Sequence, residues 1–133
     1  MKTVLITGAS SGIGRHSAIH LAERGYKVII VARNMNRLEE TIRNAPSIAS
    51  NMHPYKVDVS DSESLTNTAN LILKEWGHID VLVNNAGYGL KGPLEFLEMW
   101  EIQKQFQTNV FGLMEFTKLF IPQMRRRGTG TII

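Results

Sequence analysis

Short apolar runs alternate along the chain with longer segments whose apolar residues recur at helical spacing. The runs fall at residues 2–6, 27–32, 53–57 and 79–84, and another begins at 130–133. The second run is continuous and β-branched, which is typical of a parallel strand covered on both faces. Strands that alternate with helices predict a parallel sheet with right-handed crossovers. We therefore expect an α/β fold, a Rossmann-like doubly wound sheet of four strands and the start of a fifth.

The intervening segments predict helices with recognisable boundaries. Ser60 and Glu63 have the capping-box spacing, so we expect Ser60 to be the N-cap of the helix that follows. In the first helix Ile13, Ala18 and Ala22 fall on one side, which predicts a buried face. The expected helices span residues 13–24, 36–44, 60–76, 94–108 and 110–127, with Gly25 and Gly77 ending the first and third.

Composition adds limits to this picture. The 133 residues are enough for one domain, 1–133, and 43% hydrophobic with 20% charged residues is ordinary for a globular protein. The absence of cysteine excludes disulfides and any cysteine nucleophile or ligand. His16 and His20 have a metal-ligand spacing, but no further ligand completes a site, so we expect no metal and two solvent-facing histidines.

The net charge of +3 is concentrated in Arg125, Arg126 and Arg127. These arginines follow an apolar helical run and precede Gly128, so we interpret them as the last turn of a helix rather than a nucleic-acid patch. No aromatic interleaving or second basic cluster supports nucleic-acid binding. No apolar stretch is long enough to span a membrane, and the start does not have the pattern of a signal peptide, so we expect a cytoplasmic protein.

A glycine-rich turn follows the first predicted strand and opens the first predicted helix. Glycine allows a sharp turn and lets a ligand sit against bare backbone, while the unpaired N–H groups at the start of a helix favour phosphate. The pattern is G-x-x-x-G-x-G, and the turn predicts a nucleotide site. Its candidate residues are Gly8, Ser10, Ser11, Gly12, Ile13 and Gly14.

The ends of the other strands indicate which nucleotide is bound. Where an acidic residue would accept hydrogen bonds from the adenosine ribose, this chain has Arg33, which suits a 2′-phosphate. That choice favours NADP over NAD. Asp58 is placed to hold the adenine amino group. Asn85, Ala86 and Gly87 let the backbone approach the ribose.

These residues together resemble the short-chain dehydrogenase/reductase family over the whole chain. Thr7 to Gly14 looks like the cofactor motif of that family, Asp58 like its adenine aspartate, and Asn84 to Gly87 like its NNAG segment. Asn109 sits where the family has its active-site asparagine. The stretch from residue 85 to 94 is similar to members that act on hydroxysteroids, retinol-like alcohols and other ketones.

The resemblance implies hydride transfer between NADP(H) and a small-molecule carbonyl/alcohol pair. In that chemistry a tyrosine is the general acid and base, a lysine four residues on lowers its pKa, and a serine polarises the carbonyl. Tyr26, Tyr55 and Tyr88 are each followed four positions on by a residue other than lysine. Of the usual four active-site residues only Asn109 is present, so we expect no activity from the chain alone.

Three readings remain open. The chain stops within its fifth predicted strand, from which we expect the N-terminal, cofactor-binding portion of a longer NADP-dependent oxidoreductase, truncated at its C-terminal end. The alternatives are a catalytically inactive nucleotide-binding or regulatory module and a fragment completed by a partner chain. In the family the helices that correspond to residues 94–127 commonly form the subunit interface, so a homo-oligomer is a further expectation.

Overall fold

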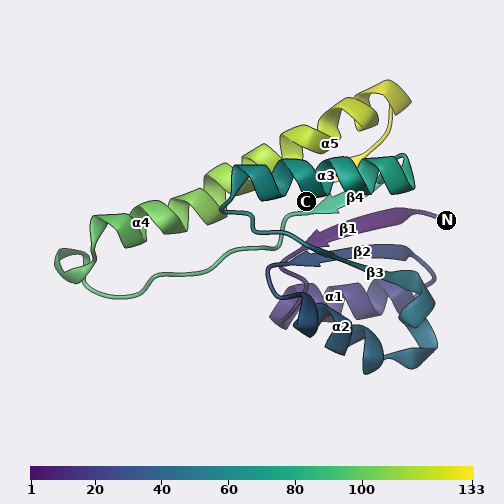
Figure 1. Cartoon of the computed structure of the whole chain (residues 1–133), viewed down its shortest axis with the longest axis horizontal. Helices are drawn as coiled ribbons and strands as arrows, with labels where there is room; N and C mark the ends of the chain where they lie inside the picture. Colours follow the sequence, from purple (N-terminus) through teal and green to yellow (C-terminus); the bar gives the residue numbers. More distant parts are fainter.

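Five parallel strands form the centre of the structure, in the order β3-β2-β1-β4-β5 (Figure 1). The computed structural model describes all 133 residues of the chain. Strand β1 pairs with β2 on one side and with β4 on the other, so the strand order reverses beside it. The predicted Rossmann-like α/β sheet of four strands and a short fifth is confirmed. The strands are β1 Thr3–Thr7, β2 Lys27–Ala32, β3 Met52–Lys56, β4 Val81–Val83 and β5 Thr131–Ile132.

Helices cover both faces of this sheet (Figure 1). Helices α1 and α2 lie on one face, whereas α3 and α5 lie on the other. Short 3₁₀ turns occur at Pro46–Asn51 and Leu94–Phe96, and a π-helical segment occupies Gln107–Gly112. The α-helices are α1 Gly12–Glu23, α2 Met35–Arg43, α3 Ser62–Trp76, α4 Met99–Phe106 and α5 Leu113–Arg127.

Each face of the sheet has its own apolar core, because successive side chains of a strand point to opposite sides. Leu5 belongs to the core under α3 and α5, whereas its neighbours Val4 and Ile6 belong to the core over α1 and α2. In the first core Phe116 and Phe120 pack edge to face, with ring centroids 5.0 Å apart. Each fully buried side chain of this size contributes roughly 1.5–3 kcal/mol. The two cores hold the strand ends in fixed relative positions.

Helix α3 does not begin with the predicted capping box. Asp61 is its N-cap, and the Asp61 carboxylate accepts a hydrogen bond from the backbone N–H of Glu63 at 3.0 Å. Ser60 instead donates its hydroxyl to the Asp58 carboxylate at 2.6 Å. The predicted role of Ser60 was wrong because the helix begins one residue later than predicted, where the Asp61 carboxylate caps it.

The chain from Met99 to Arg127 is one continuous helical path rather than the two separate helices that the sequence predicts. Helix α4 passes through the π-helical segment into α5, and α4 extends beyond the sheet (Figure 1). Gly112, in the π-helical segment, lies so close to the strand end that an added Cβ would collide with the carbonyl oxygen of Val59. Single π-helical turns inside longer helices are frequent at functional sites.

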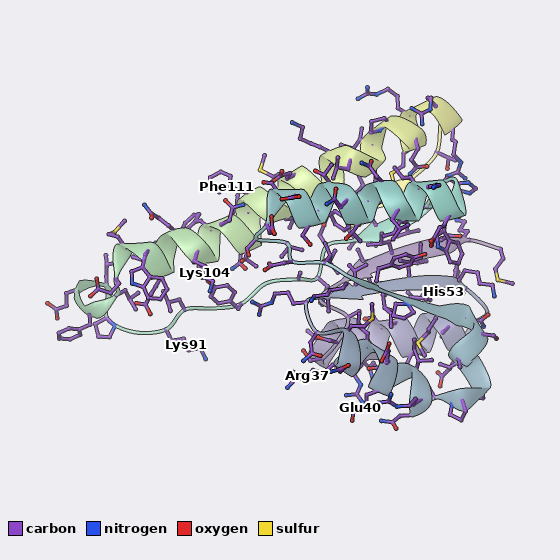
Figure 2. All side chains as sticks on the ribbon, in the orientation of Figure 1. Arg37, Glu40, His53, Lys91, Lys104 and Phe111 are labelled. Carbon is purple, nitrogen blue, oxygen red and sulfur yellow. The ribbon has the colours of Figure 1, made fainter.

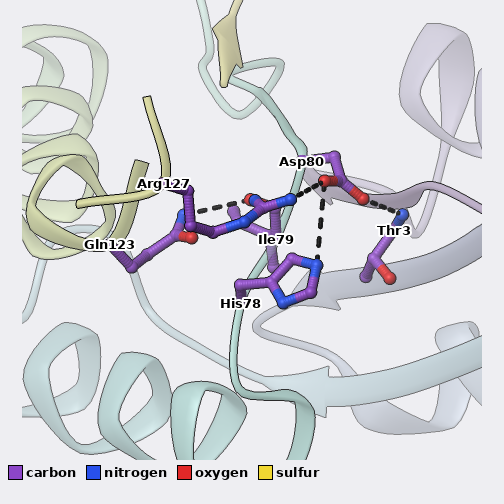
Figure 3. A network of polar contacts seen from close by, with 6 residues as sticks. All are labelled: Thr3, His78, Ile79, Asp80, Gln123 and Arg127. Atoms are coloured by element: carbon purple, nitrogen blue, oxygen red, sulfur yellow. Dashed lines mark hydrogen bonds and ion pairs between the residues drawn. The ribbon is translucent and has the colours of Figure 1, made fainter. Parts of the chain in front are cut away.

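A polar network at Asp80 ties the amino-terminal edge of the sheet to the end of α5 (Figure 3). The Asp80 carboxylate accepts from the Thr3 backbone N–H at 2.8 Å and from the Arg127 guanidinium at 2.7 Å. Gln123 donates to the carbonyl oxygen of Ile79 at 3.0 Å. Burial raises the pKa of Asp80, but the bonds from Thr3 and Arg127 outweigh it and the pKa is lowered. Arg127 therefore fixes α5 against the sheet as well as ending the helix.

His16 and His20 are exposed on α1, as predicted, and no group of three or more potential metal-ligating side chains is present. None of the helices is both long and apolar enough to cross a bilayer.

We predict that Gly112→Ala lowers the free energy of unfolding by about 3 kcal/mol, because the added methyl group meets backbone that cannot move without shifting the strand end. Gly89→Ala is the matched control, since an added Cβ there has no neighbour within 4 Å. Urea unfolding of both variants measures the difference. Equal stability of the two variants would show that the π-helical segment is not packed as closely as described.

Candidate functional site

The side chain of Asn85 joins the turn after β1 to the turn after β4. Its amide nitrogen donates to the carbonyl oxygens of Thr7 and Gly8, at 3.1 and 3.2 Å. The Thr7 hydroxyl accepts from the backbone N–H groups of Asn85 and Ala86, both at 2.9 Å, and donates to Val83. Every hydrogen-bonding position of the buried Thr7 hydroxyl is therefore used. The two turns form one rigid unit.

Glycine is required where these two turns meet. Gly8 has a φ of 64°, and an added Cβ would lie 2.8 Å from the Cα of Ala86. A Cβ at Gly14 would collide with the Asn85 amide and with the carbonyl oxygen of Gly8. Gly14 is buried beneath the turn, whereas Ile13, predicted on the buried face of α1, is 80% exposed. That part of the face prediction was wrong because the first turn of α1 faces a cavity instead of the core.

The carboxyl ends of β1, β2, β3 and β4 surround a cavity of about 670 Å³. A cavity of this size is typical of small-molecule and cofactor sites. The predicted residues brought together around it are Gly8, Ser10, Ser11, Gly12, Ile13, Arg33, Asp58, Asn85, Ala86 and Gly87.

The start of α1 lines one side of the cavity with backbone N–H groups. Ser11 is the N-cap of α1, yet its hydroxyl makes no capping hydrogen bond. The first N–H groups of a helix have no partner within the helix, and the helix dipole places partial positive charge there. The hydroxyl and the first amides of α1 are thus free donors beside the cavity.

Two arginines line the cavity beyond the end of β2. Arg33 follows the strand directly, and Arg37 stands one turn into α2, whose N-cap Asn34 accepts from the Arg37 backbone N–H at 3.2 Å. Figure 2 labels Arg37 on this helix. Both ion pairs of the structure involve Asp80, at the opposite edge of the sheet. Neither Arg33 nor Arg37 is therefore paired with a carboxylate.

Asp58 lies two residues after the end of β3 and is the single carboxylate that lines the cavity. The backbone N–H and the hydroxyl of Ser60 both donate to Oδ1 of Asp58, at 2.9 and 2.6 Å. Burial raises the pKa of Asp58, but the hydrogen bonds from Ser60 and the charges of Arg33 and Lys104 together outweigh it. The pKa of Asp58 therefore lies below its ordinary value. The carboxylate is ionised at neutral pH, and Oδ2 remains free to accept.

Asn109 lies in the π-helical segment and holds the loop after β4. Its Oδ1 accepts from the Tyr88 backbone N–H at 3.0 Å, and its amide nitrogen donates to the Tyr88 carbonyl oxygen at 2.7 Å. Both bonds go to the backbone, so Asn109 fixes the path of the loop whatever the side chain at position 88. Gly87 allows this approach, since an added Cβ would lie 2.9 Å from Oδ1 of Asn109.

The strand ends, the glycine turn and the half-buried Asn85 all lie within a match to a known family. The family model described as short chain dehydrogenase matches residues 2–133. The chain belongs to the short-chain dehydrogenase family. The resemblance that the motifs carry is thereby confirmed.

Individual short-chain dehydrogenases align with nearly all of the chain. Retinol dehydrogenase 8 of Homo sapiens is 39% identical over 137 residues, covering 99% of this chain and 43% of that protein. The 17-beta-hydroxysteroid dehydrogenase type 1 of Homo sapiens is 38% identical over 136 residues, covering 98% and 41%. An alcohol dehydrogenase of the archaeon Thermococcus sibiricus, solved in complex with 5-hydroxy-NADP, matches with a TM-score of 0.90 and 33% identity, covering 99% and 57%. The chain spans less than half the length of the two curated relatives.

Sequence reasoning missed two charged residues of this short-chain dehydrogenase site, Arg37 and Lys104. Arg37 had a signal, because it falls in the first turn of the helix that follows Arg33 and the end of β2. Lys104 had none, since its place depends on the direction in which α4 leaves the sheet. Its neighbour on the same helical path, Thr108, also lines the cavity.

We predict that Ser60→Ala raises the pKa of Asp58 toward its ordinary value of about 3.9, because one of two donors to Oδ1 is removed. A carboxyl with a lowered pKa stabilises the fold fully above its ordinary pKa, and this stabilisation is lost as pH falls through the folded-state pKa. The stability difference between wild type and Ser60→Ala should thus be full at neutral pH and shrink below about pH 4.

Carbon NMR titration of the Asp58 carboxyl measures the pKa directly. The exposed Ser47 provides a control substitution to alanine that leaves Asp58 untouched. An unchanged Asp58 titration in Ser60→Ala would rule out the described hydrogen bond as a cause of the lowered pKa.

Proposed function

We propose that the chain binds NADP(H) and supplies the cofactor site of an oxidoreductase that interconverts an alcohol and a carbonyl compound. The observation that carries the proposal is the cavity at the strand ends, where a bare-backbone turn faces two unpaired arginines. The family membership and the oxidoreductase relatives support it. A bound nicotinamide would supply the hydride donor or acceptor.

The cofactor's diphosphate is assigned to the turn between β1 and α1. Free N–H groups of the first turn of α1, with the hydroxyls of Ser10 and Ser11, provide donors there. Gly8 and Gly12 have positive φ and leave the backbone accessible. A larger side chain at either position would strain the turn and narrow the cavity.

The adenosine end of the cofactor is assigned to the residues that follow the carboxyl ends of β2 and β3. Oδ2 of Asp58 is free to accept from the adenine amino group, and the backbone of residues 85–87 borders the ribose. Arg33 and Arg37 offer two unpaired guanidinium groups for a 2′-phosphate, which carries close to two negative charges at neutral pH. The Thermococcus sibiricus relative binds a derivative of NADP, which is consistent with this choice. NADP is therefore preferred over NAD.

The reacting end of the site is assigned to the region near Asn109, as a positioning residue. Its bonds to Tyr88 hold the loop that would border the nicotinamide. None of the three tyrosines has a lysine four residues on, so the proton-transfer groups of this chemistry are proposed to come from outside the 133 residues. The chain alone is then expected to bind cofactor without turnover.

We predict that the chain binds NADP⁺ at least tenfold more tightly than NAD⁺, as measured by isothermal titration calorimetry. Arg33→Gln and Arg37→Gln should each weaken NADP⁺ binding about tenfold or more and leave NAD⁺ binding within about twofold, since a hydrogen bond to a charged group contributes roughly 1.5–3 kcal/mol.

Arg43→Gln is the matched control, because Arg43 lies in the last turn of α2 and does not line the cavity. Equal affinity for the two dinucleotides would refute the preference for NADP. Absence of binding to both would refute the proposed cofactor site itself.

We further propose that a second copy of the chain covers the exposed apolar face of α4 and the adjoining helix. Met99, Trp100, Phe106, Phe111 and Met114 are each between 53% and 64% exposed, an unusual concentration for a solvent-facing surface. The family expectation of a subunit interface at these helices agrees with that exposure.

Sedimentation equilibrium should then show a dimer that Phe111→Glu converts to a monomer, because a charge would be buried without a partner. Leu71→Glu, at an exposed leucine of α3, should leave the dimer intact. A monomeric wild type at micromolar concentrations would exclude this interface.

A further inference from the structure

Helix α4 forms one wall of the cofactor cavity through a single charged side chain. Lys104 of α4 and Thr108 of the π-helical segment line the cavity, whereas Arg33 and Asp58 line it from the sheet. Figure 2 labels Lys104 on α4 and Arg37 on α2, so that the basic side chains of the cavity come from both sides of the sheet. The cavity is thus bordered by the strand ends on one side and by α4 with the π-helical segment on the other.

Lys104 is close enough to act on the sheet side of the cavity. Its charge contributes to lowering the pKa of Asp58, together with that of Arg33. Both ion pairs of the structure lie at Asp80, so Lys104 has no carboxylate partner of its own. The four charged residues that line the cavity are three cations and one carboxylate. This excess of positive charge suits a ligand such as NADP(H), which carries a 2′-phosphate in addition to its diphosphate.

Within a single copy of the chain, helix α4 is held to the other elements mainly at one end. None of its eight residues is buried, and Figure 1 shows it extending beyond the sheet. The π-helical segment at its carboxyl end is fixed by Gly112 against Val59 and by Asn109 against Tyr88. A helix with few buried apolar contacts opens locally at low free-energy cost. A ligand in the cavity that contacts Lys104 would therefore add a second point at which α4 is held.

We propose that Lys104 is a further cofactor-binding residue, which contacts the phosphate at the adenosine end of NADP(H) and so fixes α4 when the cofactor binds. This inference rests on the proposed function. Arg33 and Arg37 hold the phosphate from the rigid side of the cavity, and Lys104 reaches it from the less constrained side. Cofactor binding and the order of α4 are then coupled through one side chain, since a ligand shifts a conformation only through contacts that favour it.

The test combines calorimetry with amide hydrogen exchange on the 133-residue chain. NADP⁺ and 2′,5′-ADP serve as probes, the second because it carries the 2′-phosphate without nicotinamide. Lys104→Gln should weaken both about five- to tenfold and leave NAD⁺ binding within about twofold. Lys104→Arg should restore most of the affinity. Lys118→Gln, at an exposed lysine of α5 outside the cavity, is the matched control.

Amide hydrogen exchange distinguishes a direct contact between Lys104 and the cofactor from a general electrostatic effect of the Lys104 charge. At a protein concentration low enough to keep the chain monomeric, saturating NADP⁺ should slow exchange in Met99–Phe106 at least fivefold in wild type and in Lys118→Gln, but not in Lys104→Gln. Protection of the first turn of α1 should persist in all three proteins.

Two results would overturn the inference in distinguishable ways. If wild type and Lys104→Gln bind NADP⁺ equally and protect α4 equally, the inference is wrong while the proposed function stands. If wild type binds neither NADP⁺ nor 2′,5′-ADP, the proposed function and the inference fail together.

Discussion

The structure of the site depends on the side chain of Asn85, which bonds the turn after β1 to the turn after β4 through the carbonyl oxygens of Thr7 and Gly8. These bonds are possible because Gly8 and Gly14 carry no Cβ where the two turns meet. A side chain at either position would force the turns apart and misplace the first amides of α1. The half-buried side-chain amide of Asn85 and the absence of a Cβ at Gly8 and Gly14 therefore determine where a phosphate can be held.

Charged residues are paired at the amino-terminal edge of the sheet and unpaired at its carboxyl edge. At the amino-terminal edge Asp80 satisfies its charge internally, through Thr3 and Arg127, and ties α5 to the sheet. At the carboxyl edge Arg33, Arg37 and Lys104 remain unpaired around the cavity. Unpaired cations contribute little to stability, and their mutual repulsion opposes folding. Their placement is better explained by an anionic ligand than by the needs of the fold.

The sequence predicted the sheet, its strand ends and the residues that surround the cavity, because buried parallel strands and glycine turns leave local signals. Ser60 was wrongly predicted as the N-cap because the spacing of Ser60 and Glu63 does not reveal that Asp61 caps the helix one residue later. Ile13 faces the cavity because the first turn of α1 stands beyond the edge of the sheet. The continuous path through Asn109 and the place of Lys104 depend on the packing of Gly112 against Val59, which no local pattern encodes.

We propose that the carboxyl edge of the sheet is a site for NADP(H). Amide chemical-shift mapping of the nitrogen-15-labelled chain during titration with NADP⁺ tests it most directly. We expect the largest changes at residues 8–14, 33–37, 58 and 85–87, and changes near zero at Thr3, Asp80 and Arg127 on the opposite edge. If saturating NADP⁺ left the glycine turn unperturbed, or perturbed chiefly the residues around Asp80, the carboxyl edge would not be the cofactor site.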